Sequence, residues 1–231
     1  VHRAGSVSRS TIQARPLCVD LDGTLSRTDL LVEAVFALLK RNPLYVFLLP
    51  LWLLRGKAAL KQAIADRVEL DVTLLPYNQP LLDWIKVQST QGRSLILATA
   101  ANTKYAEQVA FHLGLFDQVL ASDSQTNLSG SRKRDRLVAA FGERGFDYAG
   151  NDVVDIQIWA KAGAAILVDA PPTVAPRVQA VTEIARVFSS PRPGWRDYAK
   201  AIRLHQWLKN LLVFVPLVMA HRAADVALLL Q

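Results

Sequence analysis

Hydrophobic and polar positions divide the chain into an apolar strand, a helical stretch and a region where strands and helices alternate. The strand is predicted over residues 17–21, a short apolar run that ends in a polar turn containing Gly23. Apolar residues then recur at helical spacing over 29–41, 57–70 and 79–91. We therefore expect residues 27–90 to form a helical insertion.

The densest apolar stretch of the insertion is 44–54, which follows the break at Asn42-Pro43. It is too short to span a bilayer, because a spanning helix needs about 20 residues. A buried or interfacial helix is predicted instead. Packing within the insertion is favoured over contact with a membrane or a lipid chain, since a helix that is apolar all round is usually buried.

After the insertion, short apolar runs alternate with amphipathic segments, which is typical of an α/β fold with a doubly wound parallel sheet. Ligands of such sheets bind at the carboxyl ends of the strands, so the polar residues that follow each strand are the candidates for function. Strands are predicted at 94–98, 118–121, 147–149 and 164–168, and helices at 103–113, 133–142 and 154–162.

The first strand carries Asp20 and Asp22, two carboxylates one residue apart. Strand alternation points both side chains to the same face. Two buried carboxylates are costly unless a cation lies between them, and a divalent metal is the simplest such cation. Gly23 permits an unusual backbone turn, and Thr24 can donate a hydrogen bond to an anion.

Further polar groups follow the later strands. Thr99 places a hydroxyl where a phosphoryl oxygen could be held, and Ala100 follows it as a second expected substrate contact. Lys133 opens a helix, where its charge and the helix N-terminus both favour an anion, although a solvated basic run is the alternative. The turn after the 147–149 strand adds oxygen ligands suited to Mg²⁺ from Asn151, Asp152 and Asp155.

These motifs, in this order, resemble the haloacid dehalogenase superfamily of phosphatases and phosphotransferases over about residues 16–188. The segment Asp20-Leu-Asp-Gly-Thr24 is the most specific part of the match. The resemblance implies that Asp20 is a nucleophile forming an aspartyl-phosphate and that Asp22 is first a general acid and then a general base. It also implies that Thr99 binds the phosphoryl group and that Lys133 neutralises its charge.

The same resemblance implies a Mg²⁺ ion bound by Asp20, by the backbone carbonyl of Asp22 and by the 151–155 turn. Residues 27–90 would be a helical cap. The sequence departs from the family pattern at Asn151, where the family usually has an aspartate, while Asp155 is in register and Asp152 is available through a small shift of the turn. An amide oxygen can bind the metal, but without charge.

The net charge of +7 lies at the two ends of the chain, because residues 16–188 are neutral. Without a compact basic patch carrying aromatic residues, nucleic acid is not expected as a partner. Residues 1–15 hold three arginines and no apolar run of a secretory signal, so they are predicted to be a disordered leader.

A linker at 191–194 precedes a basic amphipathic stretch, 195–210, and an apolar run, 211–220. This pattern is typical of a membrane entry, and a helix packed on the domain is the alternative. Residues 203–216 resemble the opening of the first transmembrane helix of UbiA-type polyprenyl-group transferases, especially relatives of decaprenyl-phosphate phosphoribosyltransferase. That resemblance implies that 189–231 are the truncated start of a membrane domain, with the hydrolase domain on the cytoplasmic face of the cell membrane.

Together these patterns predict a phosphoric monoester hydrolase that precedes a membrane transferase and acts on a phosphorylated small molecule such as a sugar or isoprenoid phosphate. Two alternatives stay open. Asn151 favours a degenerate, non-catalytic binding or regulatory domain. In the third interpretation the hydrolase-like part only assists assembly of the transferase.

Overall fold

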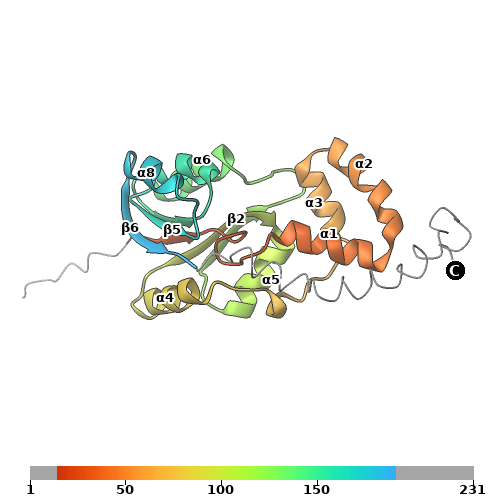
Figure 1. Ribbon diagram of the computed structural model, residues 1–231, viewed down its shortest axis with the longest axis horizontal. Coiled ribbons are helices and arrows are strands. Elements are labelled where there is room, and N and C mark those ends of the chain that lie inside the picture. The colour runs from red at the N-terminus through yellow and green to blue at the C-terminus, as the bar shows by residue number, and fades with distance from the viewer. Residues whose placement is uncertain (1–14, 191–231) are drawn as a thin grey trace, which may run out of the picture. The chain divides into compact units, whose positions relative to one another are not determined.

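A computed structural model of the chain describes residues 15–190. The predictions of a leader and of a membrane entry fall outside these residues, apart from their innermost positions. The described part contains one parallel sheet, the helices on its two faces, and a helical projection beyond the carboxyl ends of its strands (Figure 1).

The sheet has six strands in the order β3-β2-β1-β4-β5-β6, and every neighbouring pair is parallel. The chain winds outward from β1 in two directions, so the predicted doubly wound α/β sheet is confirmed. The strands are β1 (Leu17–Val19), β2 (Leu95–Asn102), β3 (Gln118–Ser122), β4 (Asp147–Gly150), β5 (Ala164–Val168) and β6 (Glu183–Phe188).

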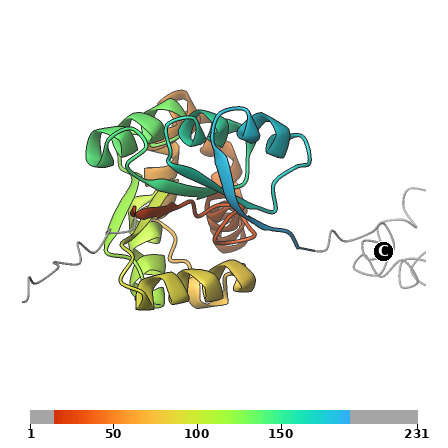
Figure 2. The same ribbon diagram turned by 90° about the vertical axis from the view of Figure 1, so that its left-hand side faces the viewer.

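Strand alternation creates two cores, one on each face of the sheet. In β1, Leu17 and Val19 point into one core and Cys18 points into the other. Helices α4 (Gln79–Thr90) and α5 (Thr103–Leu113) cover the first face, and α6 (Ser131–Phe141), α7 (Ile156–Trp159) and α8 (Val174–Gln179) cover the second (Figures 1 and 2).

Two elements near the end of the described part, α8 and β6, had no counterpart in the sequence pattern. Strand β6 lies at the edge of the sheet, and its burial does not alternate because several of its side chains face water. The predicted helix at 154–162 is shorter than expected, consisting of the 3-10 turn η3 (Val153–Asp155) and α7. The sequence pattern missed α8 because its six residues are too few to show a helical repeat, and it missed β6 because the burial of this strand does not alternate.

The helical projection consists of α1 (Leu30–Arg41), the 3-10 helix η1 (Pro43–Phe47), α2 (Leu49–Leu54) and α3 (Lys57–Ala65). We call these four elements the cap. Beyond them come the 3-10 turn η2 (Val72–Leu74) and α4, which packs on the sheet rather than in the cap. An isolated antiparallel bridge pairs Ser26 with Tyr77, so the insertion leaves and rejoins the sheet layer at neighbouring points.

The run 44–54 is not a buried helix, which corrects one of the two alternatives predicted for it. Its inner side chains, Tyr45, Leu49 and Trp52, are half-buried against the core. Its outer side chains face solvent, and Leu54 is 84% exposed. The prediction failed because the cap is too thin to cover two apolar faces of the same helix.

Within residues 15–190, no helix combines the length and the apolar character that crossing a membrane requires.

A pair of alanine substitutions tests this layering. Ile85 on α4 is fully buried, so Ile85→Ala leaves a cavity and should lower the free energy of unfolding by about 2–5 kcal/mol. Leu54→Ala removes an exposed side chain and should change the free energy of unfolding by less than about 0.5 kcal/mol. Urea unfolding followed by circular dichroism measures both, and equal costs at the two positions would contradict the arrangement.

Candidate active site

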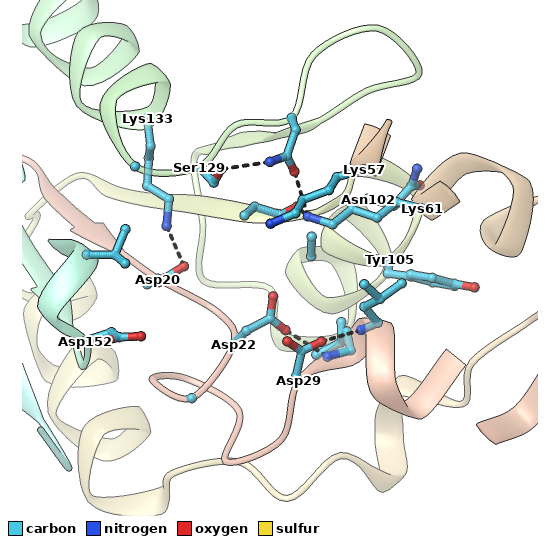
Figure 3. A pocket seen from close by; sticks show the side chains of 18 of the residues that line it. Asp20, Asp22, Asp29, Lys57, Lys61, Asn102, Tyr105, Ser129, Lys133 and Asp152 are labelled. Atoms are coloured by element: carbon cyan, nitrogen blue, oxygen red, sulfur yellow. Dashed lines mark hydrogen bonds and ion pairs between the residues drawn. The ribbon is translucent and has the colours of Figure 1, made fainter. Parts of the chain in front are cut away.

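A cavity of about 800 Å³ opens at the carboxyl ends of β1, β2 and β4, between the sheet and the cap (Figure 3). Its walls combine the turn after β1, the start of α6, the turn after β4 and helix α3 of the cap. Six of the residues expected from the sequence to bind a metal or to act in catalysis line it: Asp20, Asp22, Lys133, Asn151, Asp152 and Asp155. Ala100, an expected substrate contact, lines it as well.

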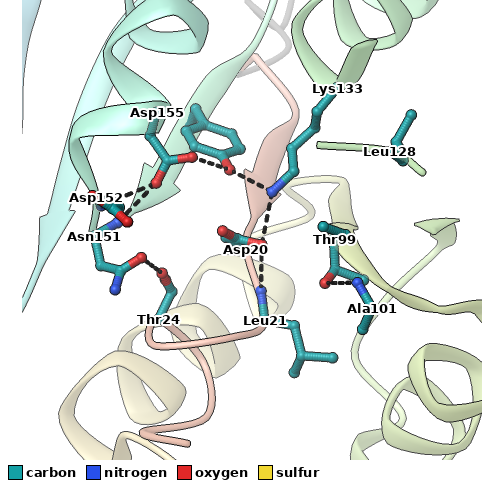
Figure 4. Close-up of polar contacts among 12 residues, drawn as sticks. Asp20, Leu21, Thr24, Thr99, Ala101, Leu128, Lys133, Asn151, Asp152 and Asp155 are labelled. Carbon is teal, nitrogen blue, oxygen red and sulfur yellow. Dashed lines mark hydrogen bonds and ion pairs between the residues drawn. The ribbon is translucent and has the colours of Figure 1, made fainter. Parts of the chain in front are cut away.

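Asp155 and Asp20 are the two most buried carboxylates on the cavity wall, and only 8% of Asp20 is exposed. One of its oxygens, Oδ1, accepts from the backbone N–H of Leu21 at 2.8 Å and from Lys133 Nζ at 2.8 Å (Figure 4). Lys133 is itself buried and also contacts the hydroxyl of Tyr148 at 3.1 Å. The two residues expected to act together therefore meet across the site, and Oδ2 of Asp20 takes no part in these bonds.

The turn after β1 depends on a residue without a side chain. Gly23 has a φ of +73°, and a Cβ placed there would lie 2.3 Å from Nδ2 of Asn151. Thr24 is fully buried, and its hydroxyl donates to Oδ1 of Asn151 at 3.2 Å. Thr24 thus joins the β1 turn to the β4 turn, and its predicted contact with an anion stays a prediction.

Asp22 lies in the cavity next to Asp20 and is anchored to the cap. Its Oδ1 accepts from the backbone N–H of Leu30, the first residue of α1, at 2.9 Å. Burial raises the pKa of Asp22 to about 7, with smaller contributions in the same direction from Asp29 and Asp20. A carboxyl group with this pKa is partly protonated at neutral pH, as a general acid must be.

Thr99 and Ala100 follow one another in β2 but have different surroundings. Thr99 is fully buried, and its hydroxyl accepts from the N–H of Ala101 at 2.9 Å. Among the described residues, those lining the cavity include Ala100 and Ala101 but not Thr99. The predicted contact of Thr99 with a phosphoryl group stays a prediction, whereas Ala100 presents a surface to the cavity.

The turn after β4 is organised by Asp155. Its Oδ2 accepts from the backbone N–H groups of Asn151 at 3.1 Å and Asp152 at 3.2 Å, and its Oδ1 accepts from the Tyr148 hydroxyl at 3.1 Å. Burial and then the charge of Asp20 raise the pKa of Asp155. Asp152 is exposed and caps η3, so its carboxylate serves the turn.

The donors around Asp20 fit a hard, oxygen-liganded cation. In the described part of the chain, no three carboxylate, imidazole or thiol side chains form a metal-binding group by themselves. A Mg²⁺ ion here would therefore use Asp20, the backbone carbonyl of Asp22 and the amide oxygen of Asn151, supported by Asp155. Burial, followed by the charge of Asp20, raises the pKa of Asp155, and a divalent cation beside these two carboxylates would stabilise their ionised forms.

Sequence reasoning missed the cap's contribution to the cavity. Lys57 and Lys61 on α3 both line it, and Lys61 Nζ donates to the carbonyl of Ala100 at 2.5 Å and to Oδ1 of Asn127 at 2.7 Å. Burial lowers the pKa of Lys61. The sequence did contain a signal for a basic helix face, because lysines four residues apart in the predicted helix lie on one side of it. Only the fold shows that this face turns toward Asp20.

No protein-family model matches the chain. The uncharacterized protein y4nM of Sinorhizobium fredii is 36% identical over 212 residues, which cover 91% of this chain and 41% of that protein. The chain thus spans less than half the length of this relative.

A haloacid dehalogenase family hydrolase from Salmonella enterica subsp. enterica serovar Typhi superposes with a TM-score of 0.52 at 14% identity, over 76% of this chain and 68% of that one. A phospho-aspartyl intermediate analogue of phosphoserine phosphatase superposes with a TM-score of 0.50 at 13% identity, over 81% of this chain and 98% of that one. The chain has the haloacid dehalogenase fold. In this fold, Asp20 stands at the end of the central strand β1, flanked by β2 and β4.

The buried pair of Asp20 and Lys133 gives a measurable coupling. We expect Lys133→Met to lower the free energy of unfolding by about 3–5 kcal/mol, because Asp20 then lacks its cation. The cost should be much smaller in an Asp20→Asn background. Lys161→Met breaks an exposed pair with Glu143 and should cost less than about 1 kcal/mol. Equal costs of Lys133→Met in both backgrounds would show that the pair is not coupled.

Proposed function

We propose that the chain is a Mg²⁺-dependent phosphatase that hydrolyses phosphoric monoesters of small molecules through an aspartyl-phosphate on Asp20. One observation carries the proposal: the Asp20 carboxylate lies on the cavity wall at the end of β1, held through one oxygen by Lys133, with Asp22 in the same cavity. The fold is the one in which a phospho-aspartyl intermediate analogue of phosphoserine phosphatase has been solved.

In the first half of the reaction, Oδ2 of Asp20 attacks the phosphorus atom and the bond between phosphorus and the ester oxygen breaks. The departing oxygen takes its proton from Asp22, whose raised pKa keeps that proton available. Lys133 offsets the charge on the phosphoryl oxygens and keeps Asp20 oriented. When bound, Mg²⁺ supplies further neutralisation of this charge.

In the second half, water attacks the phosphorus atom of the aspartyl-phosphate. Asp22, now deprotonated, takes the water's proton, and the bond between phosphorus and Asp20 breaks to release phosphate and the free carboxylate. The hydrogen bond from the Leu30 N–H holds Asp22 in place for both steps. The acid and base of the reaction is therefore positioned by the first turn of the cap.

The walls of the cavity beyond Asp20 support the proposed substrate class. Lys57, Lys61 and Asn102 supply polar contacts, and Leu53 and Leu60 supply apolar ones. Such a wall suits a phosphate ester with a polar and an apolar part, as in the sugar and isoprenoid phosphates inferred from the sequence.

The proposal also places this phosphatase before a UbiA-type membrane transferase, at the cytoplasmic face of the membrane. Its support is the sequence of 195–231, which lies outside the described residues, with a basic amphipathic stretch followed by an apolar run. Fractionation of cells expressing the full-length protein tests it, since recovery in the soluble fraction alone would contradict a membrane domain.

A degenerate binding domain is the second candidate, and Asn151 is the observation that favours it. The amide oxygen of Asn151 carries no charge and already accepts a hydrogen bond from Thr24. A folded protein that binds phosphorylated compounds but releases no phosphate would support this alternative.

Phosphate release separates the two candidates. We expect the chain to release phosphate in the presence of Mg²⁺ from members of a panel of sugar phosphates, isoprenyl phosphates and an aryl phosphate. Asp20→Asn should abolish release because the nucleophile is lost, and Asp22→Asn should lower kcat by about 10²–10⁴-fold. Asp83→Asn, at an exposed position of α4, is the control. Release that persists in Asp20→Asn would disprove the aspartyl-phosphate mechanism.

Restoring a charge at position 151 tests the metal site. We expect Asn151→Asp to lower the Mg²⁺ concentration needed for half-maximal activity, because a carboxylate binds the ion more tightly than an amide. Asn42→Asp makes the same chemical change at the exposed N-cap of η1 and should leave the Mg²⁺ requirement unaltered. If both variants require as much Mg²⁺ as the parent, position 151 is not a ligand.

A further inference from the structure

The segment Pro43–Leu54, made of η1, Leu48 and α2, is apolar on its solvent side as well as on its core side. Leu44, Phe47, Leu51 and Leu54 recur at helical spacing and are exposed by 67%, 72%, 56% and 84%. We call these four side chains the docking face. Figure 1 shows α2 at the end of the cap remote from the sheet. Contiguous exposed apolar side chains of this kind mark interaction sites.

The inner side of the same segment fixes the docking face in position. Tyr45 and Trp52 are half-buried, with their ring centroids 6.0 Å apart. The guanidinium of Arg67 lies 4.9 Å from the centre of the Trp52 ring. The outer leucines therefore belong to a segment held against the cap, so their exposure is a feature of the folded structure.

The charges around the docking face indicate which partner it fits. Lys40 and Arg41 precede the segment, Arg55 and Lys57 follow it, and all four are exposed. Between Glu33 and Asp66 the chain contains no acidic residue. An apolar face bordered at both ends by cations matches the boundary between anionic lipid headgroups and acyl chains.

A second copy of the chain fits this surface poorly. Two copies meeting through the docking face in a symmetric dimer would bring the basic borders together, with no carboxylate in the segment to pair with them. We propose that the docking face binds the surface of a lipid bilayer that contains anionic lipids. This binding is independent of the phosphatase activity.

A surface hollow of about 400 Å³ supports the same partner. It is lined by Leu51, Trp52, Leu54 and Arg55, three apolar side chains and one guanidinium. A guanidinium beside an apolar hollow can hold a phosphate group while an acyl chain lies along the leucines. Leu53 of the same helix lines the cavity of the candidate active site, so α2 borders both the cavity and the docking face.

A fluorescent label within the docking face tests the proposal in the full chain, whatever residues 195–231 contribute. Cys18 is buried, and burial raises the pKa of its thiol, so a thiol-reactive bimane attaches to an introduced cysteine. Leu54→Cys carries the label in the docking face. Phe111→Cys carries it on α5, where Phe111 is 91% exposed and outside the cap.

Each labelled protein is mixed with vesicles of phosphatidylcholine alone and with vesicles that also contain phosphatidylglycerol. We expect a blue shift at position 54 with the anionic vesicles, and none at position 111. Sedimentation of the chain with vesicles without a shift at position 54 would overturn the proposal, as would absence of sedimentation. A shift that grows with protein concentration without lipid would overturn it in favour of a second copy.

Charge and apolar contributions are separated by two sets of substitutions. We expect Leu51→Asp with Leu54→Asp to weaken binding to the anionic vesicles by about tenfold or more, since the apolar contact is lost. Phe111→Asp, the matched control, should bind like the parent. Replacing Lys40 and Arg55 by glutamine should weaken binding by about fivefold or more for each charge. Equal binding by all variants would show that another part of the chain contacts the lipid.

Discussion

The burial of one ionised carboxylate, Asp20, is the constraint on which the rest of the structure depends. A charge at the end of a buried strand requires a countercharge, and Lys133 supplies it from a helix more than a hundred residues later in the chain. Lys133 also contacts Tyr148, whose hydroxyl donates to Asp155. Three separate segments, at β1, α6 and β4, are thus joined by one series of polar contacts within the candidate active site.

A second set of contacts connects the cap to this centre. The first N–H of α1 holds Asp22, and Lys61 of α3 reaches the carbonyl of Ala100 at the end of β2. Both bonds cross from the cap to the carboxyl end of the sheet. A movement of the cap would therefore change the environment of Asp22, and the substrate that fills the cavity would act on the same contacts.

Much of the fold followed from periodicity, because five of the six strands and the longer helices repeat their apolar positions often enough to be recognised. The convergence of Asp20, Asp22, Lys133 and Asp155 was also accessible, since carboxyl ends of parallel strands share one edge. The hydrogen bond between Thr24 and Asn151 was not accessible, because it joins two turns that are 127 residues apart in the chain. The exposure of Leu54 could not be predicted either. The apolar residues of a segment do not show whether other parts of the fold cover both of its faces.

The bridge between Ser26 and Tyr77 has a consequence for how this protein can diversify. The bridge holds the two ends of the insertion side by side, so the cap is a loop closed at its base. Lengthening such a loop adds little to the entropic cost of closing it. Helices η1 and α2 can therefore be lengthened, shortened or exchanged for others while the strands keep their register. Two parts of the cap contact the candidate active site directly: Leu30 at the start of α1, through Asp22, and Lys61 of α3, through Ala100. In the proposed phosphatase, substrate preference can therefore vary in the cap while Asp20, Asp22 and Lys133 stay unchanged in the sheet layer.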